Sequence, residues 1–127
     1  IKHYARFADD FVLLSNRKSD LEAALPRIQN FLAERLKLEL HPKKISIRRL
    51  RQGIDFLGYV TLPHHRVLRT KTKRRMLRKV SERHKKYFKG EVAGDSFNQT
   101  MQSYLGMLSH ADTHELTQEL KNQFCWK

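Results

Sequence analysis

HYARFADDFVLL, at residues 3–14, is the stretch that decides the fold of the first part of this chain. Apolar and aromatic residues fill both ends of it, and the short step Ala8-Asp9-Asp10 lies between them. Runs rich in aromatic and β-branched residues favour strands, and a short polar step between two such runs favours a turn. We therefore predict an antiparallel hairpin that carries two adjacent carboxylates at its turn.

A helix is predicted after this hairpin, because apolar residues recur at helical spacing between residues 21 and 36. Ser19 is the expected N-cap, with Glu22 three residues later as its capping-box partner. Pro26 lies inside the pattern and should kink or split the helix. The apolar face of this helix is expected to pack on the sheet.

Shorter elements are predicted up to residue 65. Residues 38–40 and 45–47 alternate between apolar and polar side chains, which predicts two short strands with a turn between them. Residues 54–60 are the third strand region, and Gly58 inside it marks a bend or a close approach of another backbone. Pro63-His64-His65 is the plausible linker, because composition changes abruptly after it.

The second half of the chain is strongly basic. Lys and Arg outnumber Asp and Glu by 26 to 13, so the formal net charge is +13. Between Arg66 and Lys89 there are twelve cationic residues and a single acid, Glu82, together with an apolar stripe at helical spacing. This ratio is too unbalanced for a salt-bridged surface helix. Nucleic acid fits it better as a partner than an anionic membrane does.

Two more helices are predicted after the basic one. Asp95 or Ser96 is expected to cap the first, and Thr113 precedes the second. No apolar run approaches the ~20 residues that a membrane-spanning helix needs, and no signal segment opens the chain, so we expect no membrane and a cytoplasmic setting. The single cysteine, Cys125, excludes an internal disulfide framework.

The two adjacent carboxylates repel each other at a tight turn unless a cation lies beside them. Mg²⁺ takes a few carboxylate oxygens together with waters and substrate phosphates, so such a turn suits phosphoryl transfer between two metal ions about 4 Å apart. Asp9 and Asp10 are therefore candidate ligands for Mg²⁺ or Mn²⁺. Taken by itself, an Asp-Asp turn is more often a solvated hairpin than a metal site.

Phe7-Ala8-Asp9-Asp10, between two apolar strands, resembles the aromatic-x-Asp-Asp turn of reverse transcriptases. Two later segments resemble that family in the same order. LHPKK at residues 40–44 is similar to the motif that follows the turn, and GIDFLGY at residues 53–59 is similar to the primer grip. The basic helical region resembles the thumb. Details such as Ala8 look most like bacterial enzymes of the group II intron, retron and diversity-generating retroelement kind.

The resemblance implies a role for each matching residue. The two aspartates would bind the metal ions, and Phe7 and Ala8 would form the floor beneath the primer end and the incoming dNTP. Either Lys43 or Lys44 could approach the leaving pyrophosphate, and we choose Lys44 because it directly precedes a predicted strand. The remaining residues would bind nucleic acid: the primer backbone at Phe56, Leu57 and Gly58, and the duplex at Arg69, Lys71, Lys73, Arg74, Arg75, Arg78 and Lys79.

We therefore predict an α+β fold. Residues 1–63 should form the C-terminal part of a polymerase palm, with an antiparallel sheet and a packing helix, and residues 66–127 an all-helical basic thumb. The resemblance implies RNA-directed DNA synthesis by two-metal nucleotidyl transfer in the intact protein, on an RNA template and an RNA–DNA duplex. The family's upstream catalytic aspartate and its fingers are not in these residues, so we expect this chain alone to be inactive. Its exposed sheet edges predict self-association.

Two other interpretations stay open. One is a non-catalytic RNA-binding module like the intron maturases, whose palm and thumb also bind structured RNA. The other is a free-standing basic nucleic-acid binder from a decayed gene, which would bind without depending on a divalent metal at the acidic turn. An aspartate-bearing strand upstream of residue 1 would favour the polymerase over both.

Overall fold

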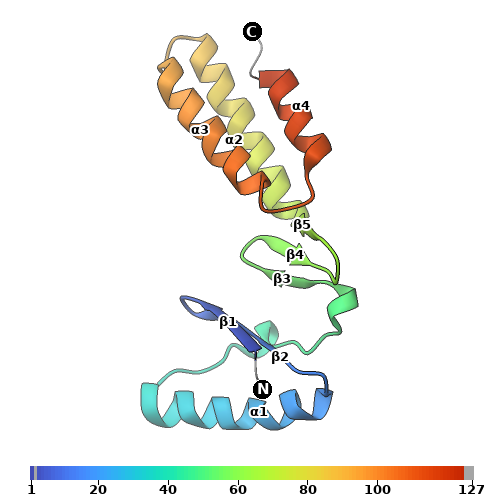
Figure 1. Ribbon diagram of the computed structural model, residues 1–127. Coiled ribbons are helices and arrows are strands. Elements are labelled where there is room, and N and C mark those ends of the chain that lie inside the picture. Colours follow the sequence, from blue (N-terminus) through green and yellow to red (C-terminus); the bar gives the residue numbers. More distant parts are fainter. Residues whose placement is uncertain (2, 125–127) are drawn as a thin grey trace. The chain divides into compact units, whose positions relative to one another are not determined.

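The computed structural model of the protein describes residues 1 and 3–124. The chain divides into two compact units, Ile1–Arg49 and Leu50–Lys127 (Figure 1). The described residues contain a two-stranded sheet, a three-stranded sheet and four α-helices, so the predicted α+β class is confirmed. Cys125 lies outside the described residues. None of the helices in the described part is long and apolar enough to cross a membrane.

The first unit begins with the predicted hairpin. Strand β1 (His3–Phe7) pairs antiparallel with β2 (Asp10–Leu14), and Phe7 lies directly opposite Asp10. This register leaves only Ala8 and Asp9 in the loop, so Asp10 is the first residue of β2 and not part of the loop. Ala8 adopts a left-handed backbone with φ of 51°, the sign of φ that two-residue hairpin loops require.

Helix α1 (Lys18–Phe31) follows, as the apolar spacing predicts, but its start differs from the expected one. The N-cap is Arg17, and Ser19 lies inside the helix, so the predicted cap is wrong. Ser15 takes over the polar role at this end: its hydroxyl accepts from the Arg17 N–H at 3.2 Å and donates to the Asp20 carboxylate at 2.8 Å.

Pro26 does not split α1, because the helix continues to Phe31. A proline inside a helix removes one backbone hydrogen bond, and α1 nevertheless keeps its helical assignment on both sides of Pro26. The hydrogen-bond pattern changes only afterwards, where the π-helical turn η1 (Leu32–Leu36) ends at the left-handed residue Lys37.

The strands predicted at residues 38–40 and 45–47 are wrong, since neither segment pairs with another strand. The 3₁₀ turn η2 (Pro42–Lys44) lies between them and satisfies its groups locally, with the Lys44 N–H donating to the His41 carbonyl at 2.9 Å. Alternating apolar residues form a strand only when a neighbouring strand supplies hydrogen-bond partners. The described residues of this unit supply none for these two segments.

No described residue of the first unit is buried. Its large apolar side chains are exposed, from Tyr4, Phe7, Phe11 and Leu14 of the hairpin to Phe31, Leu36 and Leu38 at the end of the helix. An isolated two-stranded hairpin is marginally stable in water, and a helix gains most of its stability from packing. The described residues of this unit therefore lack a hydrophobic core of their own.

The second unit begins with the turn η3 (Leu50–Gln52) and a three-stranded antiparallel sheet of order β3-β4-β5. The third strand region is a tight hairpin of β3 (Ile54–Phe56) and β4 (Tyr59–Thr61), joined by Leu57 and Gly58. Both loop residues have positive φ, 55° and 86°, as in a type I′ turn. The predicted bend at Gly58 is therefore confirmed.

Strand β5 (Arg66–Leu68) pairs with β4, so the helix predicted to begin at Arg66 begins later. Val67 lies opposite Val60 in this pairing, and Leu68 turns into the core. These contacts with the sheet outweigh the helical tendency of the first basic residues. The sheet thus continues past the predicted linker, and the division into palm and thumb near residue 63 stays a prediction.

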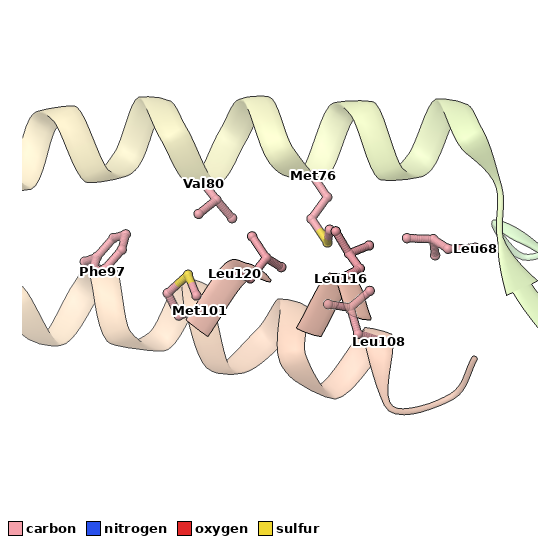
Figure 2. Packing of buried hydrophobic residues seen from close by; sticks show 8 residues of the cluster. All are labelled: Leu68, Met76, Val80, Phe97, Met101, Leu108, Leu116 and Leu120. Carbon is pink, nitrogen blue, oxygen red and sulfur yellow. The ribbon is translucent and has the colours of Figure 1, made fainter. Parts of the chain in front are cut away.

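Three helices complete the second unit: α2 (Thr70–Phe88), α3 (Gly94–Leu108) and α4 (His114–Phe124). All three are predicted elements, although the N-cap of α3 is Ala93 and not Asp95 or Ser96. Figure 2 shows the core between them, where side chains from β5 and all three helices meet. Its buried members are Leu68, Met76, Val80, Phe97, Met101, Leu108, Leu116 and Leu120.

Gly53, just before β3, generates a prediction about stability. It has φ of +83°, and a Cβ added there would lie 2.6 Å from Cγ1 of Val60. We expect Gly53→Ala to lower the free energy of unfolding by about 1–3 kcal/mol, as measured by denaturant unfolding.

The matched control for this prediction is Gly106→Ala in α3, where the added Cβ would meet nothing within 4 Å. Because alanine favours the helix over glycine, this variant should gain about 0.4–1 kcal/mol. Equal stability of the two variants would contradict the strain assigned to Gly53.

Asp20 at the start of α1 generates a pH-dependent prediction. The hydrogen bond from the Ser15 hydroxyl lowers the pKa of Asp20 below its ordinary value of 3.8, and Arg17 adds to the effect while burial opposes it. A carboxyl with a lowered folded-state pKa stabilises the fold above its ordinary pKa, and the contribution is lost as pH falls through the folded value. We expect Ser15→Ala to raise the pKa of Asp20 in an NMR titration. An unchanged pKa would rule out this cause.

Candidate active-site turn and nucleic-acid interface

The loop of the acidic turn is held by a side chain of β1. The Arg6 side chain donates from Nε to the Ala8 carbonyl at 2.9 Å, across the loop between β1 and β2. Phe7 and Asp10 face each other in the register, and directly opposed residues of an antiparallel pair point to the same face. The aromatic ring and the Asp10 carboxylate therefore share one face of the hairpin, with Asp9 at the tip.

Both carboxylates of the turn are exposed. Within the described part of the chain, neither Asp9 nor Asp10 has a side-chain hydrogen bond or an ion pair, although Arg6 lies only a few residues away. Two adjacent acids without a cationic partner repel each other, so this turn is suited to bind a cation.

The donor set of the turn fits a hard divalent cation in kind. Carboxylate oxygens are the protein ligands that Mg²⁺ prefers, and Mg²⁺ commonly uses one or two of them with waters and phosphates in the other positions. No group of three or more His, Cys, Asp or Glu residues that could hold a metal occurs in residues 1 and 3–124. Any further protein ligand would have to come from elsewhere.

The other predicted catalytic residue, Lys44, is the last residue of η2, and it is exposed. No hydrogen bond or ion pair of the described residues joins its side chain to the acidic turn. The structure thus brings Phe7, Ala8, Asp9 and Asp10 together, and it does not bring Lys44 into contact with them.

The Phe56-Leu57-Gly58 segment forms the tip of the second hairpin. Phe56 is half-buried, and the Leu57 side chain is 48% exposed, at the apex of the loop. The Gly58 carbonyl accepts a hydrogen bond from the Arg69 N–H at 2.9 Å. An apolar side chain is therefore presented to solvent from a turn whose backbone is fixed.

The predicted nucleic-acid contacts of α2 and its N-cap divide into two kinds. Six of the seven predicted nucleic-acid contacts are exposed: Lys71, Lys73, Arg74, Arg75, Arg78 and Lys79. The seventh, Arg69, is half-buried and pairs with Asp55, donating from Nε to Oδ1 at 2.8 Å. The acid Glu82 lies 3.8 Å from the Arg78 guanidinium on the exposed face and leaves the excess positive charge in place.

The Asp55–Arg69 pair is not predicted by the sequence. The two residues lie 14 positions apart, and no helical or strand spacing relates them. The only signal was an acid inside an otherwise basic and apolar segment. A second contact that the sequence does not predict is the Tyr59 hydroxyl, which donates to the Met107 carbonyl at 2.8 Å and ties β4 to α3.

Comparison with known proteins adds one match. No curated protein matches the chain. Residues 1–61 match the family model described as Reverse transcriptase (RNA-dependent DNA polymerase), a segment that contains both the acidic turn and the Leu57-Gly58 turn. The first 61 residues are thus similar to the reverse transcriptase domain, and this match supports the reverse transcriptase family for the chain.

Proposed function

We propose that this chain is the C-terminal palm and the thumb of a reverse transcriptase of the bacterial retroelement type, and that the intact protein carries out RNA-directed DNA synthesis. The observation that carries the proposal is the Asp9-Asp10 turn. It combines two exposed carboxylates without partners in the described residues, an aromatic residue on the same face as Asp10, and a place inside the segment that matches the family.

Asp9 and Asp10 are the residues that would hold Mg²⁺ or Mn²⁺. When bound, the metal ions supply charge stabilisation for nucleotidyl transfer from a dNTP to the primer 3′ hydroxyl, with pyrophosphate leaving. Phe7, which is 64% exposed, offers an apolar floor on the Asp10 face, and Ala8 keeps the tip of the turn small. Lys44 is proposed to stabilise the leaving pyrophosphate as a cation.

The second unit is proposed to hold the nucleic acid. The exposed Leu57-Gly58 turn would contact the primer backbone, and the basic face of α2 the phosphates of the RNA–DNA duplex. Lysine and arginine recognise phosphates without reading the sequence, and an RNA-containing duplex is recognised mainly by its shape. An RNA template and dNTP are therefore the partners that this arrangement suits.

The chain by itself is proposed to be inactive. Its described residues offer no third acid beside the turn, and the first unit buries none of its described side chains. A palm completed by upstream strands and fingers would supply both the missing ligand and an apolar partner for the hairpin and α1.

A maturase-like RNA-binding module is the second candidate. The cationic face of α2 favours it, because contacts with phosphates need no catalytic turn. It predicts RNA binding by a protein that never extends a primer.

The acidic turn is tested by primer extension on an RNA template with Mg²⁺ and dNTP, using the parent protein that includes the upstream residues. Asp9→Asn and Asp10→Asn should each lower the rate at least about 100-fold, because metal ligands stabilise transition-state charge by several kcal/mol. Duplex binding should persist. Asp95→Asn, which removes an exposed acid on α3, serves as the control and should leave the rate unchanged. Binding without synthesis by the wild-type parent would support the maturase-like module instead.

The basic face is tested by the salt dependence of duplex binding. Lys71, Arg74 and Arg78 are exposed and follow one another at helical spacing on α2. Replacing all three with Gln should weaken binding and reduce the slope of log K against log salt concentration by about 0.9 for each phosphate that is no longer neutralised. Lys121→Gln, an exposed cation on α4, should leave the slope nearly unchanged. Equal slopes for the triple variant and the wild type would show that these residues of α2 do not contact phosphates.

A further inference from the structure

We propose that Asp55 and Arg69 are positioning residues, which hold the Leu57-Gly58 turn against the first turn of α2. The turn and the basic face would then meet one nucleic-acid backbone as a single rigid surface. This inference rests on the proposed function. It reassigns Arg69, expected from the sequence to contact nucleic acid, to a contact inside the protein.

Arg69 holds the hairpin at two places. Its side chain donates from Nε to Oδ1 of Asp55 at 2.8 Å, and Nη2 contacts the same oxygen. Its backbone N–H donates to the Gly58 carbonyl at 2.9 Å. Asp55 lies on β3 before the turn and Gly58 lies in the turn, so one residue fixes both the strand and the loop that follows it.

Gly58 also contacts α2 directly. A Cβ added at Gly58 would lie 3.3 Å from the Thr72 hydroxyl oxygen, and Thr72 is buried in the first turn of α2. The turn therefore packs closely against the helix, and its left-handed backbone, with φ of +86°, favours glycine at this position.

The rest of the sheet is anchored to the same helical core. Tyr59 donates to the Met107 carbonyl at 2.8 Å, and the Asp112 N–H donates to the Arg66 carbonyl at 2.7 Å. Leu68 is buried among the core residues, as Figure 2 shows. These contacts hold the β3–β4 hairpin against the helical core. They therefore fix the distance between the Leu57-Gly58 turn and the cations Lys71 and Lys73.

The effect of removing the Asp55 charge on nucleic-acid binding distinguishes a positioning role of Arg69 from direct phosphate binding by Arg69. If Arg69 bound phosphate, Asp55 would compete for its guanidinium, and removing the acid would strengthen nucleic-acid binding. If the pair positions the turn, removing the acid weakens the grip on the primer. The pair is exposed at 40% for Arg69 and 45% for Asp55, and exposed pairs contribute little to stability, so the variants should fold.

The experiment measures processivity of the parent protein, as product length per binding event in the presence of an RNA–DNA duplex trap. Asp55→Asn and Arg69→Gln should each lower processivity by up to about fivefold, the upper limit for the loss of one exposed ion pair. The double variant should be no worse than either single one, because the two residues act through one contact. The salt slope of duplex binding should stay unchanged in Arg69→Gln.

The matched control is Glu82→Gln, which removes an acid from an exposed pair with Arg78 on the same helix. It makes the same charge change as Asp55→Asn and should not lower processivity. Hydrogen exchange provides a readout that needs no activity: the Arg69 amide, bonded to Gly58, should exchange faster in Asp55→Asn.

Three results would overturn the inference. The first is processivity in Asp55→Asn that equals or exceeds that of the wild type. The second is a salt slope reduced by about one in Arg69→Gln, which marks a phosphate contact, and the third is an Arg69 amide that exchanges at the same rate in Asp55→Asn and the wild type. A wild-type parent that extends no primer would overturn the proposed function, a result that cannot be confused with a processivity loss confined to the variants.

Discussion

The burial of Leu68 is the constraint on which the second unit depends. This residue ends β5, and its side chain lies in the core formed by α2, α3 and α4. Because Arg69 follows immediately, its N–H and its guanidinium are placed where they reach Gly58 and Asp55. The apolar contact thus fixes the polar ones, and the position of the exposed Leu57-Gly58 turn follows from both. A basic helix alone would carry charge without fixing the position of this turn.

The first unit, in contrast, has no buried apolar side chain among its described residues. None of its described residues is buried, and the aromatic and aliphatic side chains of the hairpin and α1 remain exposed. The hydrophobic effect favours removing such surface from water, and an amphipathic helix gains most of its stability from what covers its apolar face. The acidic turn therefore lies on a scaffold whose own described residues provide no buried apolar core.

The elements that the sequence predicts well are those with a strong local pattern. The hairpin at residues 3–14 and the helices around Val80, Phe97 and Leu116 follow from alternation or helical spacing. The failures occur where a partner decides the outcome. Residues 45–47 alternate like a strand but have no pairing partner among the described residues, and Arg66–Leu68 joins β4 although its basic composition favours the following helix. The spacing of apolar residues within one segment does not show which other strand that segment will pair with.

The candidate site shows the same limit at the level of single residues. The acids of the turn could be predicted because they are adjacent and lie between two strands. The role of Arg69 could not, because charge alone does not distinguish a cation that faces a phosphate from one that faces Asp55. Asp55 and Glu82 are both exposed acids paired with arginines in the basic half of the chain. Glu82 pairs within one helix, where its loss alters only local charge. Asp55 pairs across two elements, so its partner determines where a turn is held, and only the fold reveals the difference.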